Sequence, residues 1–226
     1  VIEWADGRIF LVDTGMDANQ AIEFGRMIES TLGGKETVVN GTAAELLGDD
    51  IERVAGVGFT HLHIDHTQGL VAFCDQKKSK AQLIQTDWQR NEHNHVTSEG
   101  AGILAASCLT AETISPGGLV VHEDYPGLGI AAIGGHTPGS TMYAVWIDDE
   151  LFLLSGDTTN SKVEILENRG KGFFYSNFLV PEDTKRTEEL RRWLLEKDQQ
   201  NNITVVVSHD LADIQASGIL EYSVAH

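Results

Sequence analysis

The 226-residue sequence has few basic residues, few cysteines, few prolines and no long apolar run, and each shortage excludes a class of protein. Lys and Arg total 16 against 34 Asp and Glu, which gives a formal charge of −18. Phosphate backbones and anionic membranes bind to basic surfaces, so we expect neither nucleic acid nor a membrane as a partner. No uninterrupted apolar stretch reaches the ~18 residues that a membrane-spanning helix needs.

The two cysteines, Cys74 and Cys108, are too few for a disulfide scaffold. A chain of this length buries roughly 70% of its unfolded surface without one. The pair is either two buried thiols or one disulfide, and we favour free thiols. No signal-peptide pattern is present, and we expect a soluble protein, with the cytoplasm favoured. Export stays open, because the chain begins at Val1 within a run typical of a strand and we expect residues to precede it.

The four prolines form no Pro/Ser-rich linker, and we find neither a repeat nor a low-complexity tract. A single domain over residues 1–226 is therefore expected. Strands are predicted at 2–4, 8–12, 57–60, 81–85, 130–133, 142–147, 151–154 and 203–207. Helices are predicted at 17–32, 42–47, 98–109 and 181–197. Alternation of the two kinds of element predicts an α/β or α+β domain in which helices cover sheets.

One run of ligand-type side chains carries most of the chemical information. His61, His63, Asp65 and His66 follow directly after the predicted strand 57–60. Residues two apart in an extended segment point the same way, so His61 and His63 can bind one cation together. Asp65 and His66 begin a predicted helix, where adjacent residues diverge by roughly 100°, so they can serve a second position. Imidazoles and carboxylates fit Zn²⁺ well, and Fe or Mn acceptably.

Three further ligand-type residues, His136, Asp157 and His209, each follow a predicted apolar strand. Loops at the ends of separate strands are where rigid sheets build functional sites. A His-x-His pair alone is common in proteins without a metal, and only the full set supports the prediction. Two ions are predicted, one held by His61, His63 and His136, the other by Asp65, His66 and His209, with Asp157 bridging them.

The run from His61 to His66 resembles the HxHxDH motif of the metallo-β-lactamase superfamily. Gly135-His136-Thr137-Pro138-Gly139, Gly156-Asp157 and Ser208-His209-Asp210 are similar to the later metal motifs of that family, in the same order. Residues 11–15 resemble its early strand-to-loop motif. The resemblance covers nearly the whole chain and implies a four-layer αβ/βα sandwich with a dinuclear metal site at one sheet edge. It also implies one or two further strands before the position of Val1.

The resemblance implies a hydrolase with two divalent ions, with Zn²⁺ expected first and Fe or Mn as alternatives. A hydroxide between the ions would attack the carbonyl of a small ester or lactone. Asp65 would orient the hydroxide and pass a proton to the leaving group. Asp13 is a candidate to hold a ligand histidine by its other ring nitrogen, with capping of a turn as the alternative role.

Several branches of the superfamily can be compared with the residues present. The only basic cluster, at 77–80, does not favour a nuclease. The flavodiiron branch places a Glu where His63 stands. True β-lactamases that share the motif generally lack the bridging carboxylate, so Asp157 weakens that alternative. Glyoxalase II is similar around Thr60-His61, but it carries a further helical domain, and only 17 residues follow His209 here.

Acyl-homoserine lactonases share the His209-Asp210 pair, but they usually carry a catalytic Tyr three residues after the bridging Asp, where this chain has Asn160. Tyr175 could replace it from a neighbouring loop, although pocket lining or core is the favoured interpretation. The leading hypothesis is thus an ester or lactone hydrolase that binds a small molecule. A β-lactamase, a glyoxalase II-like thioesterase, a mono-iron oxidoreductase of the persulfide dioxygenase type and a non-enzymatic metal-binding protein are the alternatives.

Overall fold

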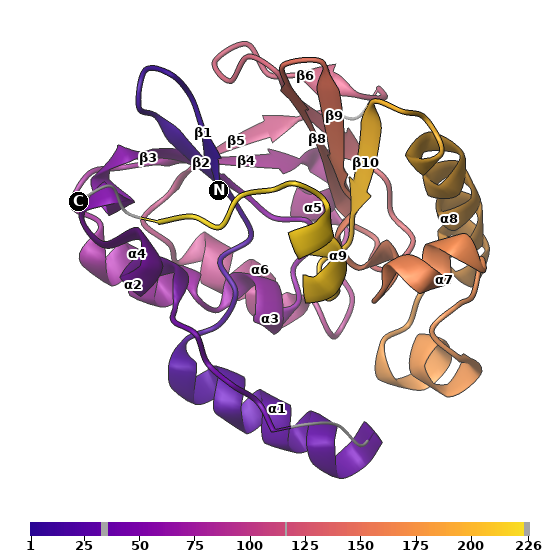
Figure 1. Cartoon of the computed structure of the whole chain (residues 1–226). Coiled ribbons are helices and arrows are strands. Elements are labelled where there is room, and N and C mark those ends of the chain that lie inside the picture. Colours follow the sequence, from indigo (N-terminus) through magenta and orange to yellow (C-terminus); the bar gives the residue numbers. More distant parts are fainter. Residues whose placement is uncertain (33–35, 116, 224–226) are drawn as a thin grey trace.

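Two five-stranded sheets form the centre of the protein, whose computed structural model describes residues 1–32, 36–115 and 117–223 (Figure 1). The first sheet has the order β1-β2-β3-β4-β5, and the second has the order β10-β9-β8-β7-β6. The strands of the first sheet are β1 (Ile2–Glu3), β2 (Ile9–Val12), β3 (Val54–Gly58), β4 (Gln82–Thr86) and β5 (Thr110–Ile114). Those of the second are β6 (Val120–Val121), β7 (Leu128–Ala132), β8 (Thr141–Ile147), β9 (Glu150–Leu154) and β10 (Ile203–Val206).

The pairing within each sheet follows from the connections. Strands β2 to β5 are parallel, because helices connect them, whereas β1 pairs antiparallel with β2. In the second sheet β6 to β9 form an antiparallel meander, and β10 returns parallel to β9 after α8. The helices are α1 (Ala18–Leu32), α2 (Ala43–Leu47), α3 (Ile64–Thr67), α4 (Leu70–Gln76), α5 (Asp87–Asn91), α6 (Ser98–Ala105), α7 (Lys162–Leu166), α8 (Thr184–Asp198) and α9 (Leu211–Ala216).

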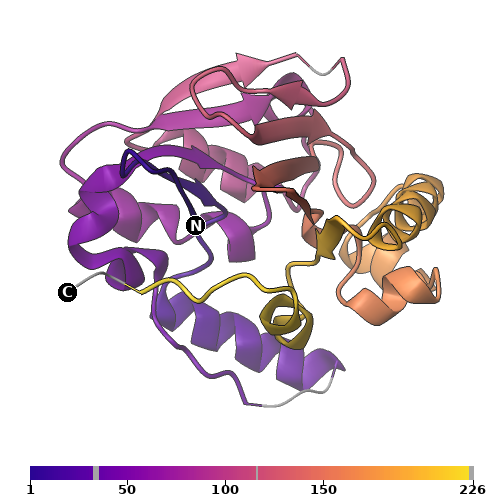
Figure 2. The ribbon, with the colours of Figure 1, turned by 45° about the horizontal axis from the view of Figure 1, so that its top comes forward.

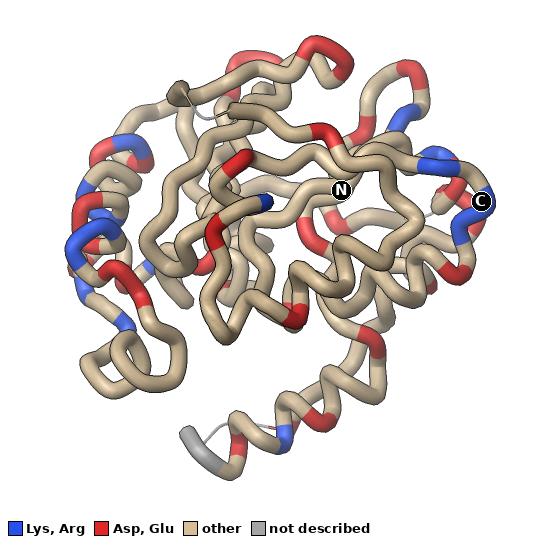
Figure 3. Tube along the Cα trace, turned by 180° about the vertical axis from the view of Figure 1, so that it is seen from behind, with Lys and Arg blue, Asp and Glu red and all other residues tan. Residues whose placement is uncertain are grey.

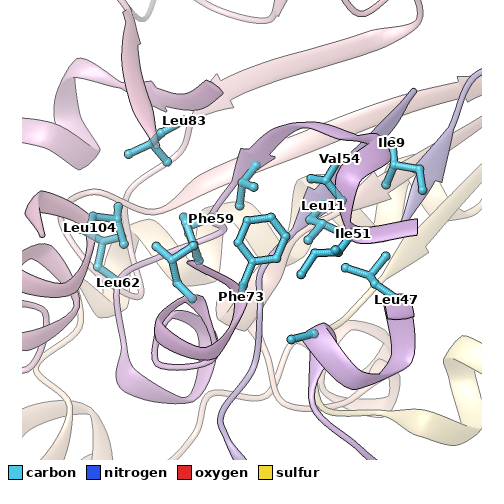
Figure 4. Packing of buried hydrophobic residues seen from close by; sticks show 13 residues of the cluster. Ile9, Leu11, Leu47, Ile51, Val54, Phe59, Leu62, Phe73, Leu83 and Leu104 are labelled. Atoms are coloured by element: carbon cyan, nitrogen blue, oxygen red, sulfur yellow. The ribbon is translucent and has the colours of Figure 1, made fainter. Parts of the chain in front are cut away.

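Three clusters of buried apolar side chains define four layers. The first joins β2 and β3 to α2, α4 and α6, with Phe59 and Phe73 near its middle (Figure 4). A second cluster packs α7 and α8 on the outer face of the second sheet, through Ile165, Leu190 and Leu194. The third lies between the sheets. This arrangement of helices, sheet, sheet and helices confirms the predicted four-layer sandwich.

Helix α1 is placed differently from the other helices. Figures 1 and 2 both show it beneath the layer formed by α2, α4 and α6, away from the two sheets.

On α8, basic and acidic residues alternate (Figure 3), so this helix presents a mixed charge and no basic stripe. Among the described residues, no helix has both the length and the apolar character needed to cross a membrane.

Three predictions need correction. The predicted helix 98–109 ends at Ala105, and strand β5, which follows it, was not predicted. Helix α8 begins at Thr184 rather than at 181. Cys74 and Cys108 form a disulfide, with 5.4 Å between their Cα atoms, so the preference for free thiols is wrong. Disulfides persist mainly in oxidising compartments, so this bond counts against the favoured cytoplasmic location.

Candidate metal centre

The structure brings all seven predicted ligand residues together at one edge of the sandwich. His61 and His63 lie in the loop after β3, and Asp65 and His66 lie on α3, as predicted. The other three follow strands of the second sheet: β7 leads to His136, β9 to Asp157 and β10 to His209. The cluster is therefore built where strand ends from both sheets meet.

His61, His63 and His136 form the first group, and all three are buried. Nδ1 of His63 lies 3.0 Å from Nε2 of His61 and 3.2 Å from Nε2 of His136. In a tetrahedral zinc site with Zn–N bonds of about 2.0–2.1 Å, neighbouring ligand nitrogens are about 3.3 Å apart. Two of the three nitrogen pairs thus already have nearly the spacing that one such ion requires, and the ligand atoms of all three residues lie within 4.8 Å of one another.

Asp65, His66 and His209 form the second group. Oδ2 of Asp65 lies 3.8 Å from Nε2 of His66 and 3.7 Å from Nε2 of His209. His209 is the most exposed member, with 42% of its side chain accessible. The second group therefore opens toward solvent, whereas the first is enclosed.

Asp157 lies between the two groups and is itself buried. Its Oδ2 is 3.0 Å from Nε2 of His209 and 3.7 Å from Nε2 of His136, and its Oδ1 is 3.4 Å from Nε2 of His66. One carboxylate thus reaches ligand nitrogens of both groups. Its place is the one that the bridging role would require.

Unpartnered atoms test whether these residues fit metal ions. Nε2 of His66 and Oδ1 of Asp157 are buried and have no hydrogen-bond partner among the described residues. Buried polar atoms are nearly always hydrogen-bonded. Two ligand-type atoms without partners, facing one another across 3.4 Å, are accounted for when a cation binds between them. The residues present therefore fit a pair of divalent cations.

The pKa values of several of these groups favour the protonation states in which they can bind a metal ion. Burial, followed by repulsion from His66, lowers the pKa of His61 well below 6.5. Burial, followed by repulsion from His136, lowers the pKa of His63 to about 3. Burial alone would raise the pKa of Asp157, but the hydrogen bond from His209 and the neighbouring histidines outweigh it and lower the pKa. Neutral imidazoles beside an ionised carboxylate are ready to bind a cation.

Asp13 makes the contact that the sequence suggested. Its Oδ2 accepts a hydrogen bond from Nδ1 of His66 at 2.8 Å and another from the Thr60 hydroxyl at 2.8 Å. Burial alone would lower the pKa of His66, but Asp13 outweighs it and raises the pKa. With Nδ1 donating to Asp13, Nε2 of His66 faces the ligand cluster.

Two charged residues of the site were not predicted. Glu182 accepts a hydrogen bond from Nδ1 of His136 at 2.6 Å. Nζ of Lys171 lies 3.4 Å from Glu182 and 3.9 Å from Asp157. Both side chains are at most 3% exposed. Neither could be singled out from the sequence, because Lys171 belongs to no motif and Glu182 is one of several acids near the start of the predicted helix 181–197.

A cleft of about 790 Å³ leads from the cluster to the surface. Its inner end includes His63, Asp65, Asp157 and His209. The outer walls are mainly apolar: one comes from α1 and the other from the segment after α7, and together they include Phe24, Met27, Ile28, Phe174, Tyr175, Leu179 and Val180. Tyr175 therefore lines the pocket, in keeping with the interpretation favoured from the sequence.

Comparisons with known proteins agree on the fold. A family model described as the metallo-beta-lactamase superfamily matches residues 1–209. No curated protein matches the chain. Among solved structures, a quorum-quenching N-acyl homoserine lactone lactonase is similar, with a TM-score of 0.65 and 18% identity over 95% of this chain and 79% of that one.

Two further similar structures contain a ligand. The B. thuringiensis protein AiiA, as a mutant with N-decanoyl-L-homoserine bound at its active site, has a TM-score of 0.63 and 19% identity over 91% of this chain and 78% of its own. AidC, a dizinc quorum-quenching lactonase in complex with a product, has a TM-score of 0.58 and 15% identity over 90% of this chain and 70% of its own. At these identities the likeness concerns the fold.

Proposed function

The chain belongs to the metallo-β-lactamase superfamily, and from this membership and the geometry of the site we propose that it is a dinuclear metal-dependent hydrolase of lactones or small esters that carry an apolar acyl chain. One observation carries the proposal: seven ligand-type side chains lie together, and four of them line a mainly apolar cleft. The similarity of the fold to solved lactonase structures supports it, and so does the ester or lactone hydrolysis expected from the sequence.

Each group of residues has a proposed task. Two divalent cations held by these residues would supply a hydroxide nucleophile at neutral pH and polarisation of the substrate carbonyl. The ligand sets are those predicted from the sequence: His61, His63 and His136 for one ion, Asp65, His66 and His209 for the other, with Asp157 between them. Zn²⁺ suits this set of nitrogens and carboxylates without thiolate, and Fe or Mn is the alternative.

Asp65 is the proposed proton carrier. Its carboxylate is 21% exposed and lies at the inner end of the cleft, beside His66 and His209. A carboxylate in that position can take a proton from the nucleophile and return it to the oxygen that leaves when the ester or lactone bond breaks. Asp65 is therefore proposed as both a ligand and the catalytic acid–base group.

The cleft supports a substrate with an apolar chain. Phe24, Met27 and Ile28 face it from α1, and Phe174 and Leu179 face it from the opposite wall. Apolar surface buried on binding contributes about 25 cal/mol per Å², so a bound acyl chain would hold the substrate and exclude water from the carbonyl. The proposed partner is a small-molecule substrate, and we propose neither nucleic acid nor a membrane as a partner.

We further propose that residues 1–226 form a single domain, since one core cluster joins the two sheets.

A panel of substrates tests the proposal. Zinc-loaded protein would be assayed with lactones of short and long acyl chain, aryl esters, thioesters and β-lactams. The expected result is hydrolysis of lactones and esters, with preference for the longer chains. Turnover of thioesters or β-lactams without lactones, or one iron per chain with oxygen consumption, would contradict it and favour the alternatives named from the sequence.

A further inference from the structure

Glu182 links the cluster of ligand residues to the wall of the cleft. We propose that Glu182 is a positioning residue, which keeps the His136 ring with a proton on Nδ1 and a free Nε2 toward the metal. It also fastens the aromatic segment, defined as residues 172–180, to that same ring. The inference rests on the proposed metal site and concerns this chain's own residues around it.

The first step is the hydrogen bond itself. Oε1 of Glu182 lies 2.6 Å from Nδ1 of His136, and the Glu182 side chain is 3% exposed. An ionised carboxylate only accepts hydrogen bonds, so Nδ1 must carry the proton. Nε2 of His136 then keeps its lone pair, and it faces His63 and Asp157 at 3.2 and 3.7 Å. The tautomer that Glu182 selects is the one that can bind an ion with the first group.

Lys171 also lies close to the His136 ring, and a hydrogen bond from it to Nδ1 would require the opposite tautomer of that ring. Nζ of Lys171 lies 3.2 Å from Nδ1 of His136 and 3.4 Å from Oε1 of Glu182. If Lys171 donated to Nδ1, the ring proton would sit on Nε2 and block the ligand atom. The carboxylate is 0.6 Å nearer to Nδ1 than Nζ is, taking 3.2 − 2.6 Å. Nδ1 of His136 therefore donates to Glu182, and Lys171 forms an ion pair with the same carboxylate as its buried counter-charge.

The second oxygen of Glu182 holds the aromatic segment. Oε2 accepts a hydrogen bond from the Ser176 hydroxyl at 2.7 Å, and the Glu182 backbone N–H donates to the Ser176 carbonyl at 2.9 Å. Ser176 is buried within the π-helical turn Tyr175–Leu179. Tyr175, which precedes Ser176, and Leu179, three residues after it, line the cleft. One carboxylate thus touches a proposed ligand and the wall that would contact the acyl chain.

Metal affinity separates this role from a merely structural one. In the double variant Glu182→Met, Lys171→Met, the acceptor is removed without leaving an unpaired buried charge. Competition with a chelator should show a 10–100-fold loss of affinity for one of the two ions, the range typical when such a partner of a ligand histidine is lost. Ser176→Ala removes only the segment's hydrogen bond, and Asp183→Asn changes the adjacent carboxylate; both should keep the wild-type affinities.

Nitrogen NMR of histidine-labelled, zinc-loaded wild-type protein gives a readout that does not depend on how the variant folds. His136 is expected to show a slowly exchanging proton on Nδ1 and a metal-shifted Nε2. A folded double variant with both affinities unchanged would overturn the positioning role while leaving the proposed function intact. A proton on Nε2 would overturn the positioning role and would also remove His136 from the proposed ligand set. Wild-type protein that binds no metal would overturn both.

Discussion

The carboxylate of Asp13 and the ring of His66 meet at 2.8 Å, although 53 residues separate them in the sequence. Oδ1 of the same carboxylate accepts from the Thr60 backbone N–H at 2.7 Å. Glu182 holds His136 in the same manner. Each proposed ion therefore has one histidine whose outer nitrogen is fixed by a carboxylate, and in both cases the partner comes from a distant segment.

Asp13→Asn tests the first of these contacts. Asp13 has a positive φ of 61°, which Asn tolerates better than most residues, so the backbone should be retained. The loss of the carboxylate should weaken binding of one ion by roughly 10–100-fold, and excess zinc should restore part of the activity. Chelator competition measures the affinity, with Asp17→Asn near the start of α1 as the control. Unchanged affinity for both ions in Asp13→Asn would refute the role of Asp13.

The stability of the metal-free protein should depend on pH through His63. Burial and the nearby His136 lower the pKa of His63 from 6.5 to about 3 in the folded state. Between these values the unfolded chain binds a proton that the folded chain does not, so stability falls as the pH is lowered through this window. Urea unfolding midpoints at about pH 7 and about pH 5 should therefore differ more for wild type than for His63→Asn. Equal differences would contradict the shift.

Tyr175→Phe tests the hydroxyl in the cleft wall. Burial, followed by the charge of Asp157, raises the pKa of Tyr175, so its hydroxyl stays protonated and able to donate at neutral pH. A hydrogen bond to a charged group contributes about 1.5–3 kcal/mol. If the hydroxyl donates to the charge that develops on the carbonyl oxygen, kcat should fall roughly 10–100-fold with metal content unchanged. Wild-type kcat in the variant would leave Tyr175 a lining residue only.

The apolar walls should set the preference for chain length. Phe24→Ala and Phe174→Ala each remove a ring from the cleft, and burial of such a side chain contributes about 1.5–3 kcal/mol. The ratio of kcat/KM for long-chain to short-chain lactones should fall roughly 10–100-fold. Phe173→Ala is the matched control, because Phe173 is an exposed aromatic of the same segment that does not line the cleft. An equal change in all three variants would argue against an acyl site.

The ligand cluster could be predicted from the sequence because its members sit at strand ends with strong apolar patterns. His136, Asp157 and His209 each follow a continuous apolar run, and the extended spacing of His61 and His63 fixes their common direction. The alternation of elements predicted sheets covered by helices, whereas the order of the four layers was implied by the resemblance to the metallo-β-lactamase superfamily. Whether each of the seven residues binds metal stays a prediction.

The remaining features depend on contacts between distant segments. Glu182 and Lys171 reach the site from the irregular stretch between α7 and α8, which has no periodic pattern. Strand β5 was missed because most of its side chains are exposed at a sheet edge and lack an apolar signal. The disulfide joins residues 34 apart, and only the packing of α4 beside the end of α6 shows that Cys74 and Cys108 meet.

The metal content of wild-type protein and of Asp157→Ala, measured together with lactone hydrolysis, tests the central claim most directly. The Asp157 carboxylate reaches ligand atoms of both groups. Two ions per wild-type chain are predicted, with fewer than two in Asp157→Ala and no turnover by that variant. A single ion in the wild type, or an Asp157→Ala protein that retains two ions and full activity, would contradict the dinuclear hydrolase.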